Sequence, residues 1–293
     1  MKILLTGGHG FIGRNIAEQL GAKHEIVAPS HREIDYTDCG AMLEFFEGHN
    51  FDAVVHSAAA PTHRAAKNTE NAVMTNLLMY AALLKCAAKS GVKRFINIGS
   101  GSEYDNSRQL CDVSEEEFGK YIPRDMTGFT KYLANFIAEP EIKIYNLRCF
   151  GVFGKYEDYT IRFISNATCR ALCGYSITLR QDRVFSYLYV DDLVEIVECF
   201  LTMDFKYKDY NITPHEKWSL LDIARLVRKI CYKDIGIDLA NPRKGLEYTG
   251  SNARLCAELN FAFTPMVDAV KLLHDWYALN FDMIDREKIL YSI

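Results

Sequence analysis

Short runs of apolar residues alternate with longer amphipathic stretches through the first half of the chain. The apolar, β-branched runs cover residues 2–6, 24–28, 52–56, 94–98 and 142–147. Runs so short and so uniformly apolar are typical of parallel strands that are buried on both faces. Helical patterns separate them, and the longest, NAVMTNLLMYAALLKCAAKSG, ends at Gly91. The alternation predicts an α/β fold, namely a Rossmann-like, doubly wound parallel sheet.

The second half of the chain is less regular. Its helical patterns cover residues 160–173, 191–203, 219–230 and 266–279, and short apolar pieces and prolines separate them. We therefore predict a first domain over residues 1–150 and a smaller C-terminal lobe over 151–293. Segments near 187–213 are expected to return to the first domain.

A glycine-rich loop joins the first predicted strand to the first predicted helix. The sequence LLTGGHGFIG places Gly7, Gly10 and Gly13 there, and Phe11 and Ile12 open the helix. Glycine allows a tight turn and a close approach of the backbone to a pyrophosphate, whose charge then lies at the positive end of the helix. Glycines also mark ordinary turns, but the strand–loop–helix context favours a dinucleotide site in the first domain.

The loop after the second predicted strand bears on which dinucleotide binds. An acidic residue there would accept from the ribose 2′-hydroxyl of NAD, whereas an Arg would accommodate the 2′-phosphate of NADP. The sequence PSHREID has no acid at the expected position, and Ser30 and Arg32 can donate to a phosphate. This pattern favours NADP. The alternative is NAD, with Arg32 as a solvated loop charge.

Composition and charge exclude several other functions. Lys and Arg number 34 against 38 Asp and Glu, and no long basic run occurs, so no nucleic-acid partner is expected. No apolar run reaches membrane-spanning length and no charged-then-apolar leader precedes KILLTGG, so we expect a cytoplasmic protein without a membrane partner. The nine cysteines form no C-x-x-C pair, so we expect buried thiols in a reducing compartment and no metal site.

Seven segments, in the same order along the chain, resemble the extended short-chain dehydrogenase/reductase family of nucleotide-sugar epimerases, dehydratases and reductases. They are the glycine loop, HSAAA, NIGSGSEY, LRCFGVFG, YLYVDDLVE, YNIT with WSLLDIARLV, and ARLCAELNFAFTPMVDAVKLLHDWY. The resemblance implies that Ser57, Ala58 and Ala59 lie near the cofactor, with Asn76 in the long helix. It further implies that Asp35 accepts from the adenine amino group and that Ser100 is the catalytic serine.

The stretch DMTGFTKYLA departs from this family. The resemblance implies a Tyr four residues before Lys131, on the same helix face, whose pKa the Lys lowers towards working pH. Thr127 occupies that position, and an aliphatic alcohol is too weak an acid and too short to act unaided. Three interpretations follow: a water held by Thr127 and Ser100 carries the proton, another acid takes over, or catalysis is lost. Asp125 and Glu103 are the candidate acids, but both can be surface charges, and we prefer that interpretation for Glu103.

The diphosphate of a nucleotide sugar requires a cation in the second lobe. The Arg that the family often has in this segment falls here at Phe185, so its phosphate clamp is shifted or absent. Arg183 is our candidate, and the alternative is a solvated charge at a strand edge. Gly151 also replaces an Asn that is usual in the family.

We therefore predict an NAD(P)-dependent enzyme that transfers hydride at a ring carbon of a nucleotide-linked hexose. Lys131, Ser100 and Thr127 are its candidate catalytic residues. The alternative is a catalytically degenerate, cofactor-binding protein of the same fold. The resemblance also implies a homodimer formed through the helices at 67–90 and 125–138.

Overall fold

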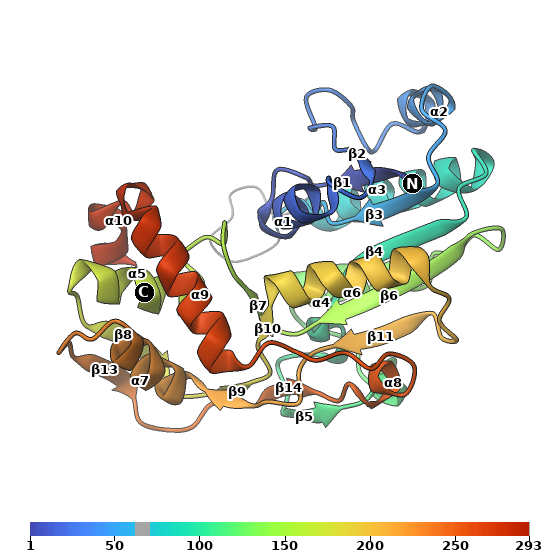
Figure 1. Ribbon diagram of the computed structural model, residues 1–293. Coiled ribbons are helices and arrows are strands. Elements are labelled where there is room, and N and C mark those ends of the chain that lie inside the picture. Colours follow the sequence, from blue (N-terminus) through green and yellow to red (C-terminus); the bar gives the residue numbers. More distant parts are fainter. Residues whose placement is uncertain (62–70, 293) are drawn as a thin grey trace.

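A six-stranded parallel sheet forms the centre of the first part of the chain (Figure 1). The computed structural model describes residues 1–61 and 71–292. Across the sheet the strands are β11 (Asp209–Ile212), β6 (Lys143–Cys149), β4 (Arg94–Ser100), β3 (Ala53–His56), β1 (Lys2–Thr6) and β2 (Glu25–Val27). Every neighbouring pair is parallel. The five predicted strands are thus confirmed, and a sixth, β11, comes from the second half of the chain.

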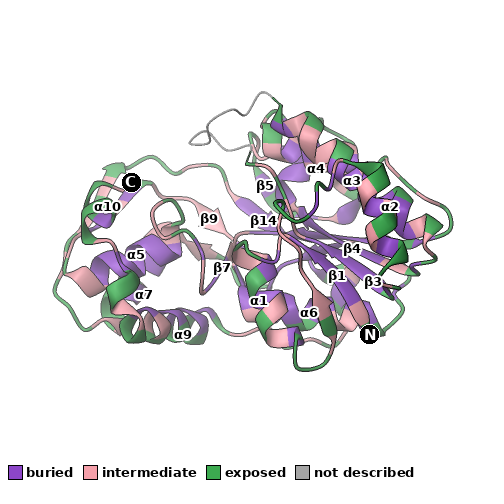
Figure 2. Ribbon diagram, turned by 90° about the horizontal axis from the view of Figure 1, so that it is seen from above, coloured by how far each residue is buried: buried purple, intermediate pink, exposed green. Residues whose placement is uncertain are grey.

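Helices cover both faces of this sheet (Figure 2). They are α1 (Phe11–Leu20) and α6 (Val190–Thr202) on one face, and α2 (Cys39–Glu47), α3 (Ala72–Lys89) and α4 (Met126–Ala134) on the other. Side chains alternate along β1: Ile3 and Leu5 pack in a core with Ile16 of α1, whereas Leu4 packs with Leu83 of α3. The predicted doubly wound α/β fold is therefore confirmed.

The order of the strands reverses beside β1, because β2 lies on one side of it and β3 on the other. In open α/β sheets, ligands bind in the crevice at the carboxyl ends of the strands where the order reverses. The loops that follow β1 and β3 therefore border the position at which a dinucleotide is expected.

A second, smaller core lies beside the sheet (Figure 2). Its elements are α5 (Phe163–Cys173), β8 (Ile177–Gln181), α7 (Leu220–Ile230), β13 (Ile237–Asn241), α9 (Met266–Leu279), η3 (Phe281–Met283) and α10 (Arg286–Tyr291). The strands β8 and β13 pair in parallel, and the helices α5, α7 and α9 pack on one another. The predicted helices of this lobe are present, although α5 begins at Phe163 and not at residue 160.

A four-stranded mixed sheet contains strands from both halves of the chain. Its order is β12 (Trp218–Ser219), β9 (Val184–Phe185), β14 (Tyr248–Gly250) and β5 (Leu110–Val113). The remaining elements are β7 (Val152–Phe153), β10 (Leu188–Tyr189), α8 (Ala253–Cys256), and two 3-10 helices, η1 (Gly101–Tyr104) and η2 (Glu115–Glu117). Because β14 pairs with β5, it lies close to η1, the turn that follows Ser100.

Across the described residues, none of the helices combines the length and apolarity that a bilayer crossing requires. Residues 1–61 and 71–292 also hold no group of three His, Cys, Asp or Glu placed to bind a metal. The prediction of buried thiols is wrong for Cys39, Cys111 and Cys256, which are exposed because they lie at the start of α2, in the edge strand β5 and at the end of α8.

Candidate cofactor and catalytic site

The glycine loop between β1 and α1 is packed as closely as the backbone permits. Gly7 has a φ of +73°, and a Cβ there would lie 2.7 Å from the amide nitrogen of Ala58. A Cβ on Gly13 would lie 2.1 Å from the carbonyl oxygen of Gly7. Gly10 is the N-cap of α1. Because Gly10 has no side chain, no N-cap side chain accepts hydrogen bonds from the first amides of the helix. This is the geometry in which a helix N-terminus receives a phosphate.

A long cleft of about 790 Å³ opens at this loop. Of the predicted cofactor-binding residues it is lined by Gly7, Gly10, Ser30, Arg32, Asp35, Ser57, Ala58 and Ala59. The side chains of Phe11 and Ile12 instead pack against the two cores, so only their amides are oriented for a phosphate. Asn76 is used within the protein, because its amide group exchanges two hydrogen bonds with the backbone of Ala60, at 2.7 and 3.0 Å.

Glu33, an acid that the sequence pattern did not indicate, bonds to Ser30 next to the end of the cleft that Ser30 and Arg32 line. Glu33 Oε2 accepts from the amide of Ser30 at 2.7 Å. Hydrogen bonds from the backbone and side chain of Ser30 lower the pKa of Glu33. Both donors of Ser30 that a 2′-phosphate would use are therefore engaged by a carboxylate. Asp35 also lines the cleft, and its Oδ1 accepts from the amide and hydroxyl of Thr37 at 2.8 and 2.7 Å.

Lys131 and Thr127 line a small cavity of about 50 Å³ that shares Ala58 and Ala59 with the long cleft. Lys131 Nζ donates to the carbonyl of Ile98 at 2.5 Å. Burial lowers the pKa of Lys131, and the Glu103 carboxylate opposes this shift. Burial, with a smaller contribution from the Lys131 charge, lowers the pKa of His56 to about 3. The imidazole at the back of the cavity is therefore neutral at physiological pH.

Ser100 ends β4 and caps η1. Its hydroxyl accepts from the amide of Ser102 at 3.1 Å and from the hydroxyl of Ser102 at 2.8 Å. Tyr248 of β14 lies on the other side of Ser100: burial raises the pKa of Tyr248, and a hydrogen bond with the Ser100 side chain opposes that shift. A phenol from the C-terminal part of the chain thus neighbours the predicted catalytic serine.

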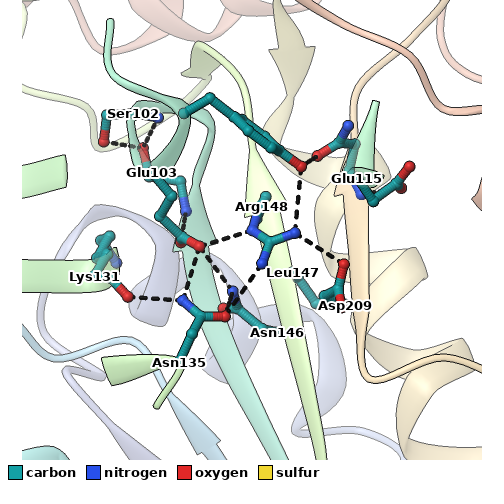
Figure 3. Close-up of polar contacts among 12 residues, drawn as sticks. Ser102, Glu103, Glu115, Lys131, Asn135, Asn146, Leu147, Arg148 and Asp209 are labelled. Carbon is teal, nitrogen blue, oxygen red and sulfur yellow. Dashed lines mark hydrogen bonds and ion pairs between the residues drawn. The ribbon is translucent and has the colours of Figure 1, made fainter. Parts of the chain in front are cut away.

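The interpretation of Glu103 as a surface charge is wrong. Its side chain is fully buried and forms an ion pair with Arg148, in which Arg148 Nε lies 2.7 Å from Glu103 Oε2 (Figure 3). Asp125, the other candidate acid, is the N-cap of α4: its Oδ1 accepts from the amide of Gly128 at 2.8 Å. The Glu103 carboxylate is thus engaged by an ion pair and Asp125 Oδ1 by the start of α4.

The other tyrosines near the sequence motif lie away from this site. Tyr132 packs against the rings of Phe118 and Phe136, each with centroids 5.1 Å from its own. Tyr104 is buried and its hydroxyl donates to Asn211 at 2.7 Å. Both rings therefore serve packing rather than the small cavity.

A second cleft, of about 600 Å³, lies in the C-terminal lobe and is lined by Arg180, Arg183, Phe185 and Asn241 among others. Arg183 is half-buried, donates from Nε to the carbonyl of Leu246 at 2.8 Å, and lies over the ring of Phe185. Burial lowers the pKa of Arg183. No carboxylate forms an ion pair with it in the described parts of the chain. Its charge is thus available to an anion in this cleft.

Comparison with known proteins agrees with this geometry. The sequence model described as the "NAD dependent epimerase/dehydratase family" matches residues 3–213, which is more than half of the chain. The chain belongs to this family. Among curated relatives of this epimerase/dehydratase chain, GDP-L-colitose synthase of Yersinia pseudotuberculosis is 29% identical over 115 residues. The alignment covers 38% of this chain and 36% of that protein.

Longer alignments relate this epimerase/dehydratase chain to other members. dTDP-glucose 4,6-dehydratase 1 of Escherichia coli is 25% identical over 271 residues, covering 76% of this chain and 75% of that one. A trifunctional enzyme of Arabidopsis thaliana with UDP-glucose 4,6-dehydratase activity is 23% identical over 267 residues, covering 80% of this chain and 40% of its own length.

Solved structures show that the fold is shared. UDP-glucose 4-epimerase of Thermotoga maritima, with UDP-glucose, superposes with a TM-score of 0.83 at 23% identity, covering 96% of this chain and 100% of that chain. GDP-L-fucose synthetase of Naegleria fowleri, bound to NADP, gives 0.83 at 18%, covering 97% and 95%. dTDP-glucose 4,6-dehydratase of Bacillus anthracis, in complex with NAD, gives 0.80 at 17%, covering 96% and 98%.

Besides Glu33, sequence reasoning missed two residues of this region, Arg148 and Tyr248. Arg148 carried a signal that could have been used, since a charge within the apolar strand run IKIYNLRC indicates a buried partner. Tyr248 carried no local signal, because only the pairing of β14 with β5 brings it to Ser100.

Proposed function

We propose that the protein binds NAD or NADP in the long cleft and transfers hydride to or from a ring carbon of a nucleotide-linked hexose. The observation that carries this proposal is the continuity of the site. The long cleft begins at the glycine loop and meets, at Ala58 and Ala59, the small cavity that holds Lys131. A dinucleotide whose diphosphate lies at α1 would extend its nicotinamide towards that cavity. When bound, the cofactor would supply or accept the hydride, and the neighbouring side chains would bind and orient the sugar.

For the substrate, we propose that the second cleft holds the nucleotide diphosphate. Arg183 would supply the positive charge there, and Arg180 lies exposed at the same cleft. Phe185 takes part through its ring, which packs beside both Arg183 and Tyr187. Gly151 lets the ring of Tyr187 pack closely, since its φ is +47° and a Cβ would lie 2.9 Å from that ring.

For the proton, we propose that Thr127 stands where related enzymes have a Tyr and that the proton passes through a water held by Thr127 and Ser100. Lys131 would stabilise the negative charge that develops on the sugar oxygen. Tyr248 is a second candidate proton donor, because its phenol neighbours the Ser100 side chain. Tyr248→Phe distinguishes the two routes: it abolishes turnover only if the phenol moves the proton.

For the cofactor, our proposal favours NADP through Arg32, which lines the cleft. Glu33 opposes this preference, because its carboxylate engages Ser30 and would repel a 2′-phosphate. Calorimetric titration with both cofactors decides between them, and clear tighter binding of NAD would contradict the proposed preference.

We further propose that the protein forms a homodimer through α3 and α4. Met74 and Leu78, one turn apart on α3, are 60% and 50% exposed, and Phe136, just beyond α4, is 64% exposed. Apolar side chains gathered on neighbouring helices are typical of a subunit interface. Part of the predicted contact helix, residues 67–70, lies outside the described residues. Light scattering tests this proposal.

A catalytically degenerate, cofactor-binding protein is the second candidate. It is favoured by the Thr at position 127 and by the bond that engages Lys131 Nζ with Ile98. The test is turnover on a panel of nucleotide sugars by the natural chain and by Thr127→Tyr, Lys131→Ala and Ser100→Ala. Turnover by the natural chain that Lys131→Ala stops supports the enzyme. Activity that emerges only in Thr127→Tyr supports degeneracy, and failure to bind either cofactor would refute both.

A further inference from the structure

A set of buried and half-buried polar side chains bonds to the backbone of two proposed catalytic residues, Ser100 and Lys131. We call Glu103, Asn135, Asn146 and Arg148 the Glu103 network (Figure 3). Glu103 is 0% exposed and Arg148 is 1% exposed. These residues come from η1, the end of α4 and β6, so the network joins three elements that carry or flank the site.

The carboxylate of Glu103 accepts hydrogen bonds from donors of β4, of the end of α4 and of β6. Oε1 accepts from the amide of Ser100 at 2.8 Å. Oε2 accepts from Arg148 Nε at 2.7 Å, from Asn135 Nδ2 at 2.9 Å and from Asn146 Nδ2 at 3.0 Å. One carboxylate thereby fixes the backbone of the predicted catalytic serine.

Asn135 extends the same contact to the catalytic lysine. Its Nδ2 also donates to the carbonyl oxygen of Lys131 at 2.8 Å, and its Oδ1 accepts from Asn146 Nδ2 at 2.8 Å. From Ser100 to Lys131 there are thus only two intervening side chains, Glu103 and Asn135. Lys131 in turn is held at its other end by the carbonyl of Ile98 in β4.

The surrounding backbone leaves room for this carboxylate. A Cβ on Gly99 would lie 2.7 Å from Glu103 Oε1 and 2.5 Å from Asn146 Oδ1. Any side chain at the residue before Ser100 would therefore displace the network, so the strand that presents Ser100 and the network fit one another.

Stability alone is a poor explanation for such a pair. Removing two charges from water costs about as much free energy as their attraction returns, and apolar replacements of similar volume are often neutral or stabilising. We propose that Glu103 is a positioning residue of this site: through Asn135 it sets where Ser100 and Lys131 lie relative to one another. This inference rests on the proposed function for its catalytic consequence, but not for the geometry it predicts.

The charge of Glu103 provides a readout that does not depend on activity. The other titratable groups facing Lys131 are His56 of β3, Tyr80 of α3 and Cys149 of β6. The Glu103 carboxylate raises the pKa of Lys131, whereas burial lowers it. Replacing this carboxylate by an amide should therefore lower the pH at which the Lys131 amine becomes reactive.

The experiment compares the natural chain with Glu103→Gln and with the double variant Glu103→Gln/Arg148→Met. The control is Glu117→Gln, at an acid whose side chain is 41% exposed and pairs only with Lys120 among the described residues. Acetic anhydride labels the amine of Lys131 over a range of pH, mass spectrometry measures the labelling rate, and urea unfolding measures stability. We expect the labelling midpoint to fall by about one pH unit or more in both Glu103 variants, as for the loss of a near opposite charge. The double variant should regain the unfolding midpoint that the single variant loses, and the control should change neither quantity.

Recovery of the labelling midpoint together with stability in the double variant would overturn the proposal, because the network would then be only structural. If both Glu103 variants fail to fold, Asn135→Ala decides, since it keeps the ion pair and removes the link to Lys131. Faster labelling of Lys131 at every pH supports the proposal in that variant, and an unchanged rate overturns it. Absence of turnover in the natural chain would refute the proposed function and leave this labelling result intact.

Discussion

Replacing Gly7 by Ala tests the phosphate loop most directly. Gly7 has a φ of +73°, and Gly91, at the end of α3, has a φ of +74°. The two residues therefore carry the same backbone strain when a Cβ is added. They differ in their surroundings, because a Cβ on Gly7 meets Ala58 at 2.7 Å whereas a Cβ on Gly91 meets nothing within 4 Å. Gly91→Ala is thus a matched control for the conformational cost alone.

The expected magnitudes follow from this difference. The left-handed conformation costs a residue with a Cβ about 1–2 kcal/mol, and the stiffer unfolded chain offsets about 0.4–1 kcal/mol of it, so Gly91→Ala should destabilise by about 1 kcal/mol. For Gly7→Ala the contacted atoms belong to the backbone of Ser57 and Ala58 and cannot rotate away. Overpacking of this kind adds about 1–3 kcal/mol, so we expect about 2–4 kcal/mol in total.

Urea unfolding of both variants measures the stability difference, and calorimetric titration with NAD and NADP measures cofactor affinity. We expect Gly91→Ala to bind the cofactor as the natural chain does. Gly7→Ala should bind at least about tenfold more weakly, because parting β1 from β3 by a few tenths of an ångström moves the amides that receive the diphosphate. Equal unfolding of the two variants, or unchanged affinity in Gly7→Ala, would refute the reasoning.

Three further predictions concern other parts of the molecule. Burial raises the pKa of Glu157 from 4.5 to about 8, so the folded state favours its protonated form and stability should fall as the pH rises from about 4.5 through about 8. Glu157→Gln should remove this pH dependence of stability. At pH 8.5 the variant should be more stable than the natural chain by a few kcal/mol, on the order of the shift itself. Urea unfolding in which the stability of both proteins changes equally between pH 5 and pH 8.5 would contradict this prediction. Glu33→Gln should raise affinity for NADP relative to NAD, because a carboxylate no longer engages Ser30, and calorimetry that finds an unchanged ratio disproves this. Phe136→Asp should halve the mass found by light scattering if α4 lies at a subunit interface, whereas Tyr232→Asp, at a residue 95% exposed, should leave it unchanged.

Much of the fold could be predicted because it depends on local patterns. The strands β1, β3 and β4 each contain a short apolar run that is buried on both faces of the sheet, and such runs stand out in a sequence. The glycine loop could be predicted equally well, because Gly adopts the φ of position 7 without strain and only Gly fits the contact at position 13. Element boundaries shifted by a few residues, as at α5, where the first turn depends on tertiary contacts.

The errors have a common physical origin. Glu103 lies in GSGSEYD, among small and polar residues that are typical of a surface turn, and its burial depends on Arg148 in a different strand. The role of Glu33 was not predicted, because its hydrogen bond with Ser30 depends on the conformation of the loop after β2. In both cases a charged side chain takes its role from a partner that the local sequence does not contain.

By itself, the sequence predicted the doubly wound sheet, the glycine loop between β1 and α1, and Ser100, Thr127 and Lys131 as candidate residues, since each depends on residues close together in the chain. Only the tertiary structure decided that Tyr248 reaches Ser100, that Asn76 is engaged by Ala60, and that one buried carboxylate joins Ser100 to the Lys131 helix. The physical reason is that hydrogen bonds and ion pairs act over a few ångströms between residues that can be far apart in sequence, whereas the propensities that specify strands and turns act between neighbours.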